Sequence, residues 1–153
     1  MRLWLITISI CISTQGVCQA LNSRDSIDIY ISKLNWNSFE ITSNHFSQLL
    51  LRADAKRIIK IKDSTKLKKL LGNLEDSTKT VAIHIVLTKL LDPMLDPSKK
   101  GFSYKYYYSK DGRMEKTVFV YNDLNWARNS GKWSIQKDEI NKVIKYWSRS
   151  IQY

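Results

Sequence analysis

Residues 102–121, FSYKYYYSKDGRMEKTVFVY, contain the pattern that decides the fold. Aromatic side chains recur at every second position from residue 102 to residue 108, which is the period of a β-strand. Asp111-Gly112 follows, and glycine accepts the positive φ angle of a tight hairpin turn at little cost. Residues 117–121 are rich in β-branched and aromatic side chains, as a returning strand would be. The stretch therefore predicts a β-hairpin.

The residues that follow this hairpin predict one more strand and a closing helix. Asn129-Ser130-Gly131 has the composition of a turn, and residues 132–135, KWSI, predict a third strand. The last segment places five apolar residues on one helical face: Ile140, Val143, Ile144, Trp147 and Ile151. Acidic residues lie near the start of this helix and basic residues later, as the helix dipole prefers.

The N-terminal half predicts helices that alternate with short strands. Helical spacing of apolar residues begins at Ile27 and continues to Leu34, and residues 38–42 alternate like a strand. Ser43 or Asn44 could cap a helix that carries Phe46, Leu49 and Leu50. Residues 56–62, KRIIKIK, are β-branched and partly alternating, which predicts a strand.

A leucine-rich helix is predicted next, at residues 67–74. Lys66, Lys68 and Lys69 lie on its other face, which indicates the solvated side of an amphipathic helix. Residues 81–91, VAIHIVLTKLL, fit both a strand and a helix. The upstream Asp76-Ser77 and the downstream Asp92-Pro93 favour the helix, because they are a suitable cap and a suitable stop.

The order of these elements predicts an α+β fold. Short helices and strands come first, and a three-stranded antiparallel meander closed by a C-terminal amphipathic helix follows. The loop at residues 92–101 contains both prolines and separates the two parts. Residues 21–153 have the length of a single domain, which buries roughly two-thirds of the surface of its unfolded chain.

The first 20 residues predict a signal peptide. Arg2 precedes an apolar run from Leu3 to Ile12, which is too short to span a membrane, and small residues precede a possible cut after Ala20. A buried N-terminal strand or helix is one alternative, and a lipid anchor on Cys18 is another. Cleavage after Ala20 would remove both cysteines of the chain and leave neither a disulfide nor a thiolate metal site. We therefore expect an exported protein, either periplasmic or secreted.

The formal net charge of +11 suggests an anionic partner. Nucleic acid, anionic lipid and acidic protein are the classes that a basic chain can bind. Export argues against nucleic acid, which leaves a protein or an anionic envelope component. A lysine-rich composition without functional meaning is the alternative.

Motifs for catalysis are absent from the sequence. It contains two histidines, His45 and His84, with neither HExxH nor a second ligand at metal-binding spacing, and no GxSxG, GxGxxG or P-loop motif. His84 lies in an apolar run, which favours a hydrogen-bonded, partly buried side chain over a base or a metal ligand. We therefore assign no catalytic residue, no metal ligand and no cofactor.

The tyrosine-rich strand supplies the candidate binding surface. Tyrosine offers rigid contact area with a polar tip, which suits recognition. The candidate residues are Tyr104, Lys105, Tyr106, Tyr107, Tyr108, Trp126 and Trp133. The alternative is that one face of the hairpin is core and the other is ordinary sheet surface.

These observations favour an exported, non-catalytic binding protein that recognises a protein or an anionic envelope component. An envelope immunity or inhibitor protein would belong to this class. A small exported hydrolase with His84 or His45 as its base is the main alternative. Adhesion to anionic surfaces through the spread of lysines is a third.

Overall fold

The computed structural model describes residues 27–42, 48–91 and 102–151. The chain has an α+β fold, as predicted. Its helices are residues 27–32, α2 (Ala53–Lys60), α3 (Lys66–Leu71), α4 (Thr80–Leu91) and α5 (Lys137–Ser150). Its strands are β1 (Phe39–Thr42), β2 (Gln48–Leu51), β3 (Phe102–Tyr108), β4 (Met114–Tyr121), β5 (Leu124–Asn129) and β6 (Lys132–Ser134).

The strands form two antiparallel sheets. β1 pairs with β2, and the other strands form a four-stranded meander in the order β3-β4-β5-β6. The predicted meander of three strands was therefore wrong, because it omitted β5. The missed turn is Asn122-Asp123, whose φ angles of 45° and 63° close a tight hairpin without any glycine. The predicted turns at Asp111-Gly112 and Asn129-Ser130-Gly131 are both present, with left-handed φ angles at Gly112, Ser130 and Gly131.

Two predictions in the N-terminal half were also wrong. The strand predicted at residues 56–62 falls largely within α2, where Ala55 and Ile58 are buried at helical spacing. Leu49 and Leu50, predicted to lie on a helix, belong to β2, in which Leu49 and Leu51 are buried while Leu50 is exposed. A short run of apolar residues fits both the helical and the strand period, so tertiary packing decided the structure of each segment. Ser43, Asn44 and Phe46 lie outside the described residues.

The remaining elements agree with the sequence patterns. The helix at residues 27–32, strand β1 and helix α5 are confirmed, and α3 occupies most of the leucine-rich segment. Residues 81–91 are helical, as favoured. Every residue from Thr80 to Thr88 is buried, which explains why neither period stood out in the sequence.

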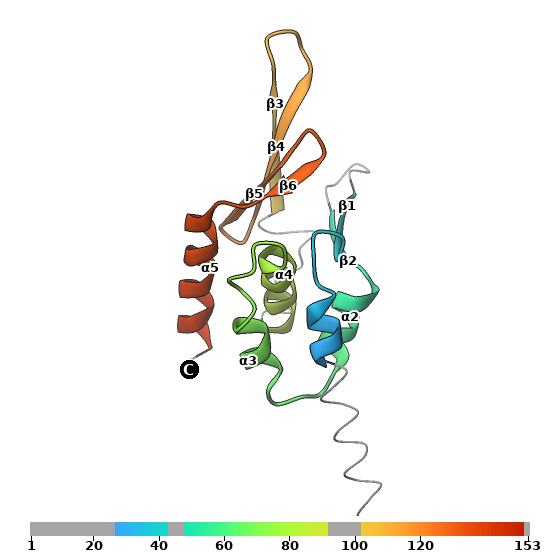
Figure 1. The fold of residues 1–153 in the computed structure, drawn as a ribbon, viewed down its shortest axis with the longest axis vertical. Helices are drawn as coiled ribbons and strands as arrows, with labels where there is room; N and C mark the ends of the chain where they lie inside the picture. Colours follow the sequence, from blue (N-terminus) through green and yellow to red (C-terminus); the bar gives the residue numbers. More distant parts are fainter. Residues whose placement is uncertain (1–26, 43–47, 92–101, 152–153) are drawn as a thin grey trace, which may run out of the picture.

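The helices form the body of the molecule, and the β3–β4 hairpin projects from it (Figure 1). Helix α4 lies between α5 and α2 at the centre of the core. Helix α5 is attached to β5 by Glu139, whose carboxylate accepts hydrogen bonds from the backbone N–H and the side-chain amide of Asn125, both at 3.0 Å.

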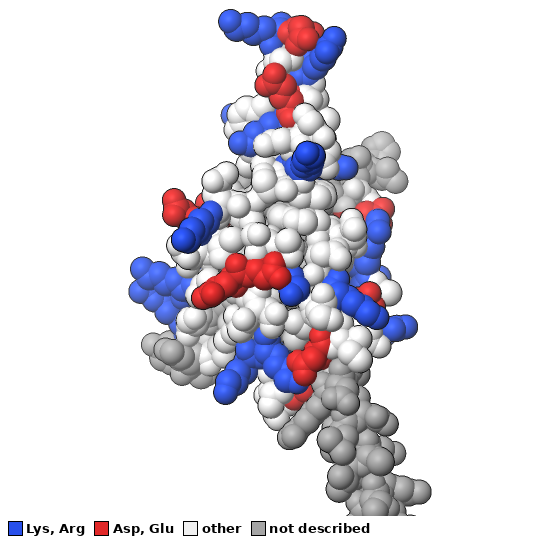
Figure 2. Space-filling model, in the orientation of Figure 1, with Lys and Arg blue, Asp and Glu red and all other residues white. Residues whose placement is uncertain are grey.

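No helix among the described residues is long and apolar enough to cross a membrane. The predicted signal peptide, both cysteines and the proline-containing loop at residues 92–101 lie outside the described ranges. Figure 2 shows lysine and arginine side chains in separate groups over one face, with acidic side chains between them.

Candidate binding cleft

One face of the four-stranded sheet carries a continuous set of aromatic side chains. The strand register places Tyr104 opposite Phe119, and Phe119 opposite Trp126. The next row towards the hairpin tip runs from Tyr106 through Thr117 and Arg128 to Trp133. Because directly opposite residues share a face in an antiparallel sheet, these rows form one surface.

The base of this surface joins the two sheets. Phe39 of β1 makes edge contacts with Trp126 and Trp133, with ring centroids 6.1 and 5.8 Å away. Trp126 also stacks on Phe119 and is only 2% exposed. The structure therefore places Trp126 beneath the candidate surface, in the core.

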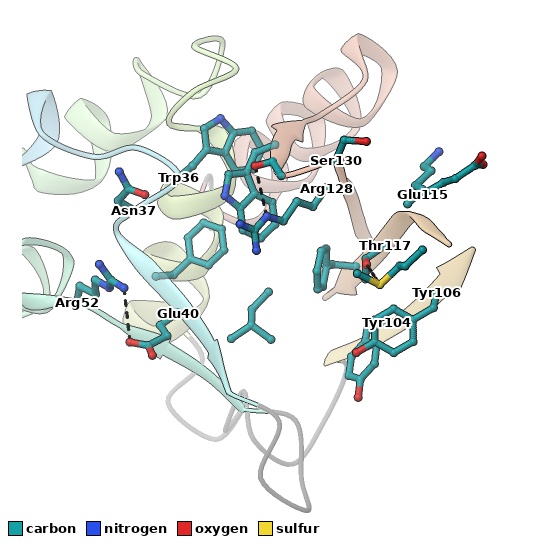
Figure 3. Close-up of a pocket in the computed structure, with 17 residues that line it drawn as sticks. Trp36, Asn37, Glu40, Arg52, Tyr104, Tyr106, Glu115, Thr117, Arg128 and Ser130 are labelled. Carbon is teal, nitrogen blue, oxygen red and sulfur yellow. Dashed lines mark hydrogen bonds and ion pairs between the residues drawn. The ribbon is translucent and has the colours of Figure 1, made fainter. Parts of the chain in front are cut away.

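A cleft of about 640 Å³ opens between β1 and this aromatic face (Figure 3). Its aromatic lining consists of Trp36, Phe39, Tyr104, Tyr106, Phe119 and Trp133. We call this space the aromatic cleft. Trp36 stacks on Trp133 with ring centroids 5.6 Å apart and planes only 4° from parallel. The volume lies within the range of roughly 300–1,000 Å³ that is typical of ligand sites.

Arg128 is an exposed cation that lines the aromatic cleft. Its guanidinium carbon lies 5.1 Å from the centre of the Trp133 ring, and its Nε donates a long hydrogen bond of 3.4 Å to the carbonyl of Gly131. In the described part of the chain, Arg128 makes no ion pair, and its two terminal nitrogens have no hydrogen-bond partner. By contrast, Arg52 at the rim pairs with Glu40 at 3.7 Å.

The tip of the hairpin exposes large side chains on both faces. Tyr106, Tyr107, Tyr108 and Met114 are all exposed. Tyr106 packs against Tyr104 with ring centroids 5.0 Å apart, and a side-chain hydrogen bond with Tyr104 raises the pKa of Tyr106. On the opposite face, the Lys105 ammonium lies 5.2 Å from the Tyr107 ring.

The predicted binding residues thus divide by position. Tyr104, Tyr106 and Trp133 line the aromatic cleft. Lys105 and Tyr107 lie on the other face of β3, Tyr108 lies near the tip, and Trp126 is buried. Sequence reasoning missed Trp36, Phe39 and Arg128, because they come from separate segments and no local pattern links them.

His84 is a structural histidine. It is 1% exposed, its Nε2 lies 3.1 Å from the Tyr121 carbonyl, and its Nδ1 accepts a 2.9 Å hydrogen bond from the Trp147 indole. This arrangement requires the neutral ring with the proton on Nε2. Burial lowers the pKa of His84 to about 4. Because both ring nitrogens are occupied, His84 has no free site for a substrate proton. His45 lies outside the described residues.

Two of the three clustered lysines on α3 have structural partners. Lys66 donates to the carbonyls of Ile59 and Ile61 at 3.1 and 2.6 Å, which caps the end of α2. Burial lowers the pKa of Lys66. Lys69 pairs with Asp28 at 2.6 Å, while Lys68 is exposed.

No cluster of three or more His, Cys, Asp and Glu side chains that could hold a metal ion occurs within the described ranges. No family model, curated protein or solved structure matches this chain. The chemistry of the aromatic cleft must therefore be inferred from its own residues. Aromatic rings and a guanidinium that makes no ion pair with any described residue suit recognition of a ligand that carries an anionic group.

Proposed function

We propose that this chain is an exported, non-catalytic binding protein that recognises a protein or an anionic envelope component. The observation that carries the proposal is the aromatic cleft, which is lined by Arg128, whose guanidinium lies over the Trp133 ring, and by the exposed Tyr106. Aromatic and arginine side chains are the residue types that dominate binding energy at protein interfaces. Export is carried by the leader pattern of residues 1–20 alone.

The hydrolase alternative has weaker support. Its candidate base His84 has both ring nitrogens in internal hydrogen bonds, and burial favours the neutral ring. A histidine that acts as the base needs a free ring nitrogen within hydrogen-bond reach of the proton that it removes.

The hypothesis of adhesion through the lysine cluster also has less support than recognition by the cleft. Lys66 and Lys69 bind carbonyls and a carboxylate of this chain. Substitution of all three lysines would therefore change stability as well as charge. Lys68→Gln is the cleaner test of adhesion, because Lys68 is exposed.

An envelope inhibitor remains a second candidate within the binding class. The projecting hairpin carries Tyr107, Tyr108 and Met114 exposed near its end (Figure 1). In this role the hairpin would enter the active site of a partner enzyme, and the aromatic cleft would bind the rim of that active site.

Matched tyrosine variants test the aromatic cleft. Tyr106 and Tyr107 are neighbours with equal exposure of 43%, but only Tyr106 lines the cleft. The probes are polygalacturonate, phosphatidylglycerol vesicles and random peptides, and binding is read from the tryptophan fluorescence of the chain and by calorimetry. We expect Tyr106→Ser to weaken binding about tenfold, which is about 1.4 kcal/mol, and Tyr107→Ser to change it less than twofold.

The opposite ranking of the two variants, or an absence of saturable binding to all three probes, would contradict a binding role for the cleft. Export is tested separately by mass spectrometry of the protein from the producing cell. We expect a mature chain that begins at Leu21. An intact N-terminus in the cytosol would contradict export.

A further inference from the structure

Strand β3 has an outer edge with no strand partner within the described ranges. It is the first strand in the order β3-β4-β5-β6, and with seven residues it is the longest strand at an edge of either sheet. The hairpin that carries β3 projects from the helices (Figure 1). Because an edge strand presents its outward N–H and C=O groups to solvent, it is a template for a strand from another chain.

The hydrogen bond at the hairpin tip shows which main-chain groups of β3 point outwards. The Ser109 N–H donates to the Arg113 carbonyl at 2.8 Å, so these two residues form a hydrogen-bonded pair. Bonded and non-bonded pairs alternate along an antiparallel ladder. Tyr107 is therefore bonded to β4, whereas the N–H and C=O groups of Tyr106 and Tyr108 point away from β4. Outside the ladder, no backbone group of a described residue bonds Tyr106 or Tyr108.

A hydrogen bond on the other side of β4 gives the same assignment. The Ser130 N–H donates to the Glu115 carbonyl at 3.3 Å, so this carbonyl faces β5. Successive residues of a strand direct their main-chain groups to opposite edges, so Lys116 faces β3, where its partner in the register is Tyr107. Tyr107 thus bonds β4, and its two neighbours in β3 present their main-chain groups at the outer edge.

The side chains beside this edge differ between the two faces of the sheet. Tyr106 and Tyr108 lie on the face of the aromatic cleft, with ring centroids 6.4 Å apart, and both are exposed. On the opposite face lie Lys105 and Lys116, which are exposed and make no ion pair with a described residue. A strand that adds to the edge alternates its own side chains between the same two faces, so its complement is apolar on one face and acidic on the other.

We infer that the outer edge of β3 binds an extended, acidic segment of a partner protein, which adds to the four-stranded sheet as a further strand. The main chain of the segment bonds the outward N–H and C=O groups of Tyr106 and Tyr108. Apolar side chains of the segment pack against the rings of these two tyrosines, and an Asp or Glu between them binds Lys105 on the opposite face. This inference goes beyond the proposed function, because it assigns a second contact surface and a class of partner.

A second copy of this chain fits the edge less well than an acidic segment does. Two hairpins paired edge to edge would bring two copies of Lys105 close together, and each chain has a formal net charge of +11. Like charges on neighbouring strands are destabilising, and a lysine in an edge strand commonly protects a protein from pairing with itself. A carboxylate of a partner is attracted by the same lysine. We therefore expect the chain alone to be monomeric.

Matched variants at Tyr108 test the main-chain contact. Tyr108→Ser removes the ring and keeps the N–H group, whereas Tyr108→Pro removes both. Proline is tolerated where a strand N–H faces solvent, so both variants should fold, which circular dichroism checks. The probe is a random heptapeptide library displayed on phage and selected on the wild-type chain. We expect Tyr108→Pro to bind an enriched peptide about tenfold more weakly than Tyr108→Ser does.

The same contact is tested from the peptide, without any change to the protein. An enriched peptide is synthesised with N-methyl groups on alternate backbone amides, in two versions. Methylation of the amides that face β3 should abolish binding, while methylation of the other amides should change it less than about threefold.

The charge contact is tested by a double-mutant cycle. We expect enriched peptides to share one Asp or Glu between two apolar residues. Lys105→Gln in the protein and Glu→Gln or Asp→Asn in the peptide should each weaken binding about threefold, and together they should weaken it little more than either alone. Lys145→Gln is the matched control, because Lys145 is exposed on α5 and its replacement changes the net charge equally. It should change binding less than about 1.5-fold.

Several outcomes overturn this inference. Equal binding to Tyr108→Pro and Tyr108→Ser, or tolerance of every N-methyl group, refutes strand addition, and so does a selection that enriches no peptide. The absence of a shared acidic position refutes the acidic partner. A dimer in analytical ultracentrifugation that Tyr108→Pro abolishes would show that a second copy occupies the edge. The proposed function survives each of these outcomes if Tyr106→Ser still weakens the binding of polygalacturonate or vesicles.

Discussion

Helix α4 and the β3–β4 hairpin differ in the exposure of their side chains. Residues Thr80–Thr88 of α4 are all buried, and their polar groups bond within the protein. The Thr88 hydroxyl donates to the His84 carbonyl at 2.8 Å, and His84 bonds both Tyr121 and Trp147. The hairpin instead exposes Tyr106, Tyr107, Tyr108 and Met114.

This contrast indicates which side chains are available to bind a partner. A polar residue in a buried helix must be satisfied internally, so His84, the residue that most resembles a catalytic group, is committed to the fold. Exposed aromatic residues on a projecting hairpin contribute little to stability and remain available to a partner. The following predictions test the contrast, in order of decreasing effect.

The largest effect is expected from a cavity in α4. Leu87 has no exposed surface, so Leu87→Ala should lower the free energy of unfolding by about 2–5 kcal/mol. Met114→Ala on the hairpin is the matched control, since Met114 is 57% exposed and should lose less than about 0.5 kcal/mol. Urea denaturation followed by fluorescence measures both. Equal losses would show that the hairpin belongs to the core.

Protonation of His84 should give the next effect. The folded state holds the pKa of His84 at about 4, below its ordinary value of 6.5, so the unfolded chain binds a proton that the folded chain does not. This contribution to stability is complete above pH 6.5 and is lost as the pH falls towards 4. From pH 7 to pH 5 the loss should be about 2 kcal/mol.

Urea denaturation of the wild type and of His84→Gln at both pH values isolates this contribution. Glutamine can keep one donor and one acceptor but does not titrate. The decrease in the free energy of unfolding from pH 7 to pH 5 should be about 2 kcal/mol smaller in the variant than in the wild type. An unchanged loss would show that His84 is not the group responsible.

A smaller effect is expected at the hairpin tip. Gly112 has a φ angle of +79°, and a Cβ built there meets no atom within 4 Å. Gly112→Ala should therefore cost only backbone strain, about 1 kcal/mol. Gly72→Ala is the control, since Gly72 has a right-handed φ of −64°. Thermal unfolding should show the larger loss at Gly112.

The smallest effect on stability is expected for the exposed tyrosines. Tyr108 is 62% exposed, so Tyr108→Ser should change the free energy of unfolding by less than about 0.5 kcal/mol. The same should hold for Tyr107→Ser. A loss above 1.5 kcal/mol in urea denaturation would contradict the separation between a helix that stabilises the fold and a hairpin that contributes little to stability.

Some of the candidate site could be read from the chain. The alternation in residues 102–108 is long enough to fix the strand and the face shared by Tyr104 and Tyr106. Arg128 could not be found in this way, because the strand that carries it follows a turn with no glycine. Trp36 lies in the turn before β1 and Phe39 lies in β1, and only the packing of this segment against the four-stranded sheet brings them to Trp133.

The sequence by itself determined the α+β class, the long hairpin and the closing helix, because each has a period repeated over many residues. It also determined that His84 would lie in an apolar segment. Only the tertiary structure decided that residues 53–60 form a helix and residues 48–51 a strand, and that two sheets enclose a cleft around Arg128. Short segments satisfy both periods equally well, so burial against distant neighbours selects between them.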